Sequence, residues 1–131
     1  MLLNFEFQKS AEPQSKPTIV LIHGLFGSLS NLGMIARVLQ LEYSVLQLDV
    51  RNHGKSAHDK EMNYTVMAQD VIETLDHLNI EQFSVIGHSM GGKIAMKLTE
   101  LAPKRLQNLI VLDMCPFAYQ ENHHDSIFKA L

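Results

Sequence analysis

The feature that most constrains the fold is a strict alternation of short apolar runs with segments of helical periodicity. The continuous β-branched run TIVLI is typical of a strand buried on both faces of a sheet. Similar runs are expected as further parallel strands at Ser44–Val50, Phe83–Ile86 and Leu109–Leu112, after a short alternating strand at Leu2–Phe7. Helical spacing lies between them, over Asn31–Leu41, in a segment that Asn63 can cap, and over Lys93–Ala102. This order predicts an α/β fold, a mainly parallel sheet with helices on both faces.

Composition excludes several classes of function. The 131 residues suffice for one domain, and the net charge of -3 without a basic run gives no support to a nucleic-acid partner. The apolar runs are far shorter than the roughly 20 residues that span a bilayer, and the first ten residues lack the pattern of a signal peptide. With one cysteine, Cys115, we expect a cytoplasmic protein without a disulfide framework. The histidines show no metal-ligand spacing, and no cofactor is expected.

The stretch GHSMGG at residues 87–92 joins an expected strand to an expected helix without a loop between them. Such a turn forces Ser89 into strained backbone angles and needs small neighbours, here Gly87 and Gly91. The serine hydroxyl would then stand at the positive end of the following helix, where backbone N–H groups can bind a developing oxyanion. The alternative is a glycine-rich phosphate-binding turn, although the glycine spacings of such turns are absent.

Three motifs in this order, HGLFGS, DVRNHGKS and GHSMGG, resemble the α/β-hydrolase superfamily, and within it the small bacterial serine esterases of the YbfF type. The resemblance implies that Ser89 is the nucleophile and that the backbone N–H groups of Leu25 and Met90 form the oxyanion hole. Asp113 would be the acid that orients the catalytic histidine, and its alternative role is a helix-capping or loop-bonding aspartate.

The remaining motif residues are expected to shape the loops around the site. His53 could act as a base, but it precedes the serine, whereas this fold places its histidine after the acid. We therefore expect structural roles for His23, Gly24, Gly87, His88, Gly91, Arg51 and His53.

A serine hydroxyl is a poor nucleophile without a neighbouring base, and the resemblance places that base in a C-terminal half beyond Leu131. Only His123 and His124 follow Asp113, in a stretch more typical of solvated surface. We therefore expect residues 1–118 to be the N-terminal half of a truncated hydrolase core and residues 119–131 the start of its cap. The last strand would then have an unpaired edge, open to the missing half or to another association.

The leading hypothesis is a serine carboxylesterase or thioesterase whose substrate is a small acyl ester or thioester, without nucleic-acid or membrane partners. On its own, the 131-residue chain should show little or no turnover, because the base is missing. Two alternatives stay open. One is a C–C lyase of menaquinone biosynthesis with the same fold, and the other is a non-catalytic truncated remnant.

Overall fold

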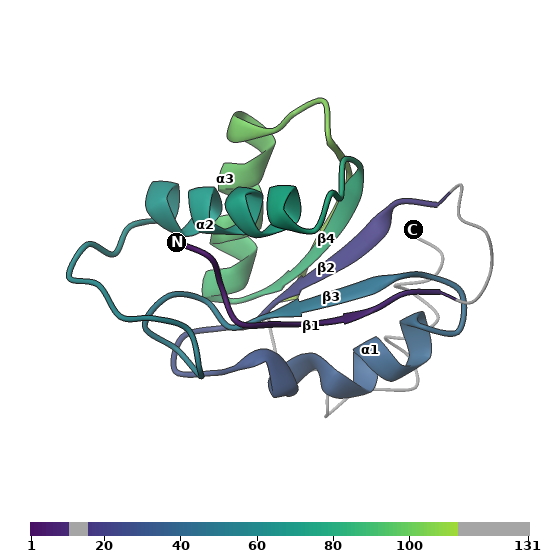
Figure 1. The fold of residues 1–131 in the computed structure, drawn as a ribbon, viewed down its shortest axis with the longest axis horizontal. Helices are drawn as coiled ribbons and strands as arrows, with labels where there is room; N and C mark the ends of the chain where they lie inside the picture. The colour runs from purple at the N-terminus through teal and green to yellow at the C-terminus, as the bar shows by residue number, and fades with distance from the viewer. Residues whose placement is uncertain (11–15, 113–131) are drawn as a thin grey trace.

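A single five-stranded sheet organises the chain in the computed structural model, which describes residues 1–10 and 16–112 (Figure 1). The strands lie in the order β1-β3-β2-β4-β5. Their bounds are Phe5–Gln8 for β1, Thr18–Ile22 for β2, Val45–Leu48 for β3, Phe83–His88 for β4 and Leu106–Leu112 for β5. The helices are a short 3-10 helix at Leu29–Leu32, α1 at Gly33–Leu39, α2 at Tyr64–His77 and α3 at Met90–Leu101.

Parallel pairing brings the carboxyl ends of strands β2, β3 and β4 to the same end of the sheet. Strand β2 lies parallel to both β3 and β4, with Ile22 opposite Leu48 on one side and opposite Gly87 on the other. Strand β5 continues the parallel arrangement beside β4, and β1 alone runs antiparallel, beside β3. The loops that carry the three sequence motifs therefore emerge close together.

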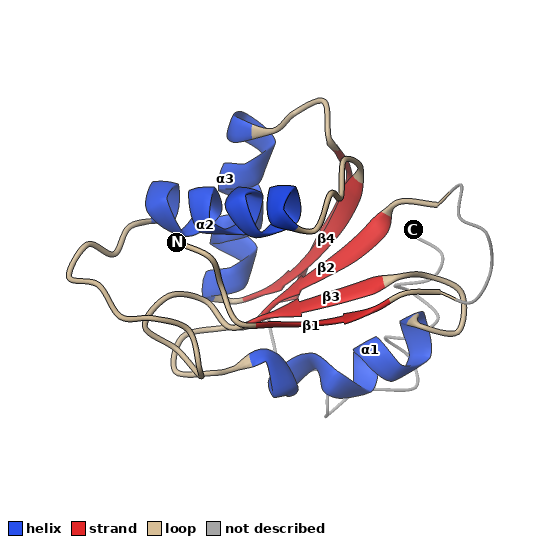
Figure 2. Cartoon of the chain, viewed as in Figure 1, coloured by secondary structure: helices blue, strands red, loops and turns tan. Residues whose placement is uncertain are grey.

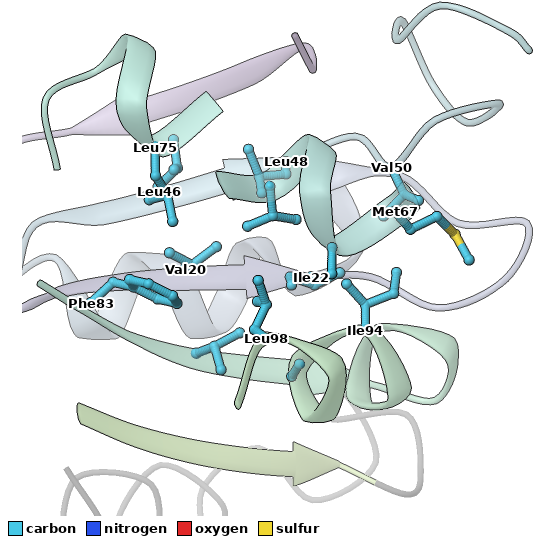
Figure 3. Packing of buried hydrophobic residues seen from close by; sticks show 14 of the residues in the cluster. Val20, Ile22, Leu46, Leu48, Val50, Met67, Leu75, Phe83, Ile94 and Leu98 are labelled. Atoms are coloured by element: carbon cyan, nitrogen blue, oxygen red, sulfur yellow. The ribbon is translucent and has the colours of Figure 1, made fainter. Parts of the chain in front are cut away.

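Helices cover both faces of the sheet, which confirms the predicted fold class (Figure 2). Successive residues of β2 point to opposite sides, so that Val20 and Ile22 pack toward α2 and α3, whereas Ile19 and Leu21 pack toward α1. Figure 3 shows the larger of the two clusters, in which Ile94 and Leu98 of α3 pack onto the same sheet face as Val20 and Ile22. A strand buried on both sides must be apolar throughout, and this requirement explains the TIVLI run.

Several boundaries differ from the sequence prediction. Helix α3 begins at Met90 rather than Lys93, because the chain enters the helix directly after Ser89 and includes two glycines in its first turn. Helix α1 is shorter than the predicted Asn31–Leu41 segment, and β5 begins three residues before Leu109. Propensity alone disfavours glycine in a helix, but here the close packing described below requires it at Gly91.

Strand β5 pairs with β4 and lies at an edge of the sheet formed by the described residues. Its side chains are mostly half-buried or exposed, and Val111 is 41% exposed. The predicted acid Asp113, Cys115, the pair His123 and His124, and the proposed domain boundary at 118/119 lie outside the described residues. Within the described residues, none of the helices combines the length and apolarity needed to cross a membrane.

Candidate active site

Ser89 occupies the sharp turn between β4 and α3. Its backbone angles, φ 55° and ψ -115°, lie in a region that residues with a side chain rarely adopt. The turn is held by three backbone hydrogen bonds. The Ser89 N–H donates to the Leu112 carbonyl (3.2 Å), and the Ser89 carbonyl accepts from Gly92 (2.9 Å) and Lys93 (3.3 Å). The side chain is exposed, and among the described residues its hydroxyl has no hydrogen-bond partner.

The two glycines that flank the serine are required by close backbone approaches. A Cβ atom on Gly87 would lie 2.3 Å from the Gly91 carbonyl oxygen, and one on Gly91 would lie 2.1 Å from the Ile22 carbonyl oxygen. Neither obstacle is a flexible side chain, so the chain cannot make room for a methyl group without moving a strand. The strained serine is thus held between β4, α3 and the end of β2.

The loop after β2 lies against this turn, since a Cβ atom on Gly24 would come within 3.3 Å of the Ser89 Cβ. The Gly24 carbonyl accepts hydrogen bonds from the Gly27 N–H (3.0 Å) and from His23 Nδ1 (2.7 Å). The Gly24 carbonyl and the Leu25 N–H belong to one trans peptide, in which these two groups point in opposite directions. The Leu25 N–H therefore points away from the two groups that donate to the Gly24 carbonyl. Within the described residues no group accepts a hydrogen bond from the Leu25 N–H or from the Met90 N–H.

His23 is buried and neutral, and its tautomer follows from its partners. The Val50 N–H donates to His23 Nε2 (3.0 Å), so the ring proton resides on Nδ1 and points to the Gly24 carbonyl. Burial lowers the pKa of His23 below 6.5, against the opposing effect of the Gly24 hydrogen bond. The ring lies 5.2 Å from that of His53, which is also buried.

The loop after β3 is organised around the carboxylate of Asp49. It accepts hydrogen bonds from the Leu29 N–H (2.8 Å), the Lys55 N–H (2.9 Å) and the Asn4 side-chain amide (2.8 Å). Burial works to raise the pKa of Asp49, but these hydrogen bonds together hold it below 3.8. We call residues 23–28 and 49–56 the loop frame.

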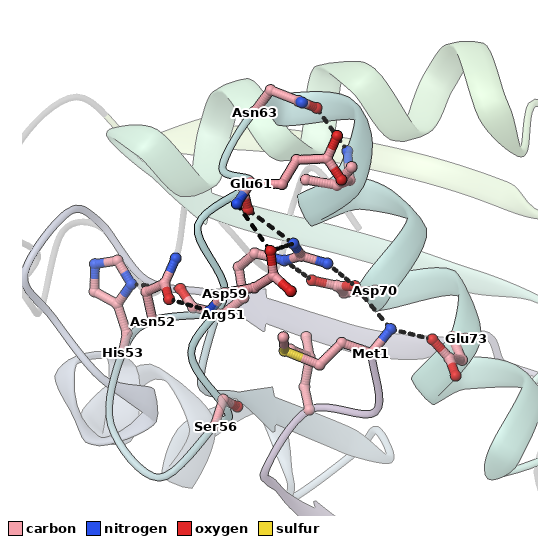
Figure 4. Close-up of polar contacts among 12 residues, drawn as sticks. Met1, Arg51, Asn52, His53, Ser56, Asp59, Glu61, Asn63, Asp70 and Glu73 are labelled. Atoms are coloured by element: carbon pink, nitrogen blue, oxygen red, sulfur yellow. Dashed lines mark hydrogen bonds and ion pairs between the residues drawn. The ribbon is translucent and has the colours of Figure 1, made fainter.

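A buried ion pair ties the loop frame to α2 (Figure 4). The Arg51 guanidinium donates to both carboxylate oxygens of Asp70, at 2.7 and 2.9 Å, and also to the Glu61 carbonyl at 2.8 Å. The hydrogen bonds to Asp70 raise the pKa of Arg51 despite burial. Arg51 was expected to be structural, but its pairing with Asp70 was not predicted, because 19 residues separate the two without a local pattern.

An open hollow of about 440 Å³ lies over Ser89. Its lining is largely apolar, and it consists of Leu25, Met62, Asn63, Tyr64, Met67, Ser89, Met90 and Lys93. Three of these residues, Met62, Tyr64 and Met67, were not predicted from the sequence, and they come from α2 and the segment before it. A larger hollow of about 690 Å³, lined by residues such as Thr18, Ser44 and Gln82, lies near the amino ends of the strands and contains none of the predicted site residues.

Comparison with known proteins agrees with this architecture. Residues 17–130 match the family described as alpha/beta hydrolase fold. The chain belongs to the α/β-hydrolase family. It is 47% identical over 131 residues to Esterase YbfF of Escherichia coli, covering 100% of this chain and 52% of that protein. It is 48% identical over 102 residues to the sn-1-specific diacylglycerol lipase ABHD11 of Xenopus laevis, covering 76% of this chain and 33% of that protein.

Among solved structures, a marine microorganism esterase matches this α/β-hydrolase chain with a TM-score of 0.77 and 34% identity, over 99% of this chain and 51% of that one. The chain therefore spans about half the length of these two esterases and a smaller share of the lipase. Of the predicted site residues, the structure brings Ser89, Leu25 and Met90 to one hollow. His88 is half-buried at the end of β4, and Arg51 and His53 lie in the loop frame.

Proposed function

We propose that this chain is the nucleophile-bearing part of a serine hydrolase that cleaves acyl esters or thioesters. One observation carries the proposal: the exposed hydroxyl of Ser89 stands on a strained strand-to-helix turn and opens into an apolar hollow. Leu25 and Met90, whose backbone N–H groups have no acceptor among the described residues, line the same hollow. Most polar backbone groups in a fold are paired, so two unpaired donors beside an exposed nucleophile favour catalysis over a purely structural turn.

In the proposed reaction, Ser89 Oγ attacks the carbonyl carbon of the ester and loses its proton to a base. The carbonyl oxygen becomes negative and accepts hydrogen bonds from the two N–H groups. The intermediate then expels the alcohol or thiol, which takes the proton from the base, and leaves an acyl group on Ser89. Water, deprotonated by the same base, attacks this acyl group. The bond from the acyl carbon to Ser89 Oγ then breaks, Oγ takes the proton back from the base, and the carboxylic acid is released.

We assign the base to a histidine outside these 131 residues, oriented by Asp113. No histidine of the described part of the chain hydrogen-bonds to Ser89, and both ring nitrogens of His23 and of His53 are engaged elsewhere. A neutral ring with both nitrogens in use has no free lone pair to accept the serine proton.

The lining of the hollow supports an apolar acyl group as the part of the substrate that binds beside Ser89. Leu25, Met62 and Met90 contribute flexible aliphatic surface, and methionine adapts well to acyl chains of different shape. The relatives named as an esterase and as a diacylglycerol lipase act on esters by their names, which agrees with this choice.

The test compares two proteins: the 131-residue chain, and the same chain extended by the part of the E. coli esterase that follows the matched region. We expect p-nitrophenyl hexanoate hydrolysis and fluorophosphonate labelling in the extended protein, and little of either in the chain alone. Ser89→Ala should abolish both activities, whereas Ser30→Ala, at an exposed serine of the 3-10 helix, should leave both unchanged.

Hydrolysis that persists in the Ser89→Ala extended protein would contradict the assigned nucleophile. Rapid turnover by the 131-residue chain alone would contradict the assignment of the base to a segment beyond it. Labelling without hydrolysis would show an activated serine whose substrate is not a simple ester.

A further inference from the structure

The peptide that follows the proposed oxyanion donor is fixed by a side chain from a different loop. The Phe26 N–H donates a hydrogen bond to His53 Nε2 at 3.0 Å. The Phe26 side chain is 91% exposed, so packing of that side chain does little to hold the loop. Its backbone also has a positive φ of 63°, a conformation that side chains disfavour. A specific contact is therefore needed to hold the chain in this shape, and the bond to His53 supplies one.

His53 is well placed to supply that contact, because its own position is fixed. The ring is 8% exposed, and its Nδ1 lies 2.9 Å from the Arg51 carbonyl oxygen. Since the Phe26 N–H can only donate, Nε2 must accept, and the ring proton must lie on Nδ1, where it donates to Arg51. His53 thus binds one backbone group of each loop through its two different nitrogens.

Arg51 in turn is held by Asp70 of α2, the helix whose first turn contributes Tyr64 and Met67 to the hollow. A continuous series of contacts therefore runs from α2 through Arg51 and His53 to the peptide beside Leu25. Figure 4 shows Arg51, His53 and Asp70 together with the loop that carries the first two.

We propose that His53 is a positioning residue of the oxyanion site, which holds the Leu25–Phe26 segment so that the Leu25 N–H faces the carbonyl bound at Ser89. The inference rests on the proposed function, because it assigns Leu25 the role of oxyanion donor. His23 binds the carbonyl of the peptide that contains the Leu25 N–H, and His53 binds the N–H of the next peptide. The donor between them is then preorganised, so that the loop does not have to reorganise when charge develops.

Two substitutions separate the two functions of the ring. In His53→Gln, the side-chain oxygen can reach the position of Nε2 and accept the Phe26 N–H. In His53→Asn, the amide can replace Nδ1 and donate to the Arg51 carbonyl, but nothing accepts the Phe26 N–H. A purely structural role for the ring would make both variants equally harmful.

In the extended protein described above, we expect His53→Asn to lower kcat for p-nitrophenyl hexanoate about tenfold, with KM nearly unchanged. Removing an oxyanion donor outright typically costs 10²–10³ in kcat, and a displaced donor should cost less. His53→Gln should retain most of the wild-type kcat. Equal losses in the two variants, or a loss confined to KM, would overturn the proposal.

A second measurement uses the 131-residue chain and does not depend on activity. In ¹⁵N-labelled protein, an N–H···N hydrogen bond transmits a scalar coupling between the Phe26 amide nitrogen and His53 Nε2. We expect this coupling in the wild type. A proton on Nε2, or no coupling in a folded chain, would overturn the proposal, whereas inactivity of the extended protein with the coupling present would count against the proposed function alone.

Discussion

The loop frame and the turn at Ser89 lie side by side, but they treat their polar groups in opposite ways. In the loop frame, the Asp49 carboxylate and the His23 and His53 rings are buried and engaged in hydrogen bonds. At the turn, the Ser89 hydroxyl and the Met90 N–H have no partner among the described residues. The comparison indicates a division of labour: the buried side chains of the loop frame are satisfied internally, whereas the turn, together with the Leu25 N–H, keeps polar groups unpaired among the described residues.

The turn also carries backbone strain, and the loop frame contributes to its support. Ser89 holds an unfavourable backbone conformation, which persists only because the surrounding structure fixes it. The support comes from backbone packing at Gly87 and Gly91, from the backbone hydrogen bonds of Ser89, and from the loop frame, whose Gly24 lies against the turn. Each of the following changes to the protein or its pH removes one kind of support, and its effect on stability measures how much the structure depends on that support.

The largest effect is expected at the turn, from Gly91→Ala. The added methyl group would overlap the Ile22 carbonyl oxygen, so α3 must separate from β2 or the turn must open. We expect the free energy of unfolding to fall by at least about 3 kcal/mol, measured by urea denaturation. Gly33→Ala is the matched control, since the first residue of α1 has helical angles and open space around it, and it should gain about 0.5 kcal/mol. Equal effects of the two substitutions would contradict the packing argument.

A slightly smaller effect is expected in the loop frame, from Arg51→Met. The substitution leaves the Asp70 carboxylate buried without its main partner, which should cost about 3 kcal/mol of unfolding free energy. The chain offers a matched pair for comparison, because Arg105 binds Asp76 of the same helix at the surface.

The side chains of Arg51 and Asp70 are 9% and 2% exposed, against 27% and 61% for Arg105 and Asp76. Arg105→Met should therefore cost only about 1 kcal/mol. An equal loss of unfolding free energy in Arg105→Met and Arg51→Met would contradict a special role for the ion pair of the loop frame.

The smallest effect concerns pH. Because burial lowers the pKa of His23 in the folded chain, the unfolded chain binds more protons below pH 6.5, and stability falls as the pH drops from there toward the folded pKa. One such group changes the unfolding free energy by at most about 1.4 kcal/mol per pH unit. Asp49, whose pKa is held below 3.8, adds a further loss below that pH. In urea denaturation between pH 8 and pH 5, the unfolding free energy of the wild type should decrease as the pH falls. The slope of this decrease should be smaller in His23→Gln. An unchanged slope in that variant would contradict the assignment.

The sequence was sufficient to predict the fold class and the strained strand-to-helix turn at Ser89, for identifiable reasons. Buried parallel strands leave a continuous apolar signal such as TIVLI, and the strained turn requires small residues at fixed positions around Ser89. The start of α3 was predicted three residues late, because glycines lower helix propensity whatever the packing demands. The pairing of Arg51 with Asp70 and the lining residues Met62 and Tyr64 depend on tertiary contacts that leave no local pattern.

The residues just before the first strand connect the start of the chain to the loop frame and to α2. The Asn4 N–H donates to Ser56 Oγ (2.8 Å), the Asn4 carbonyl accepts from the Asp49 N–H (2.9 Å), and the Leu3 N–H donates to Thr74 Oγ1 (3.1 Å). Residues far from Ser89 in sequence thus brace the loops that surround it. A protein engineer who trims these residues, or replaces them with the scar of a purification tag, would loosen the loop frame without touching Ser89 or any residue that lines its hollow.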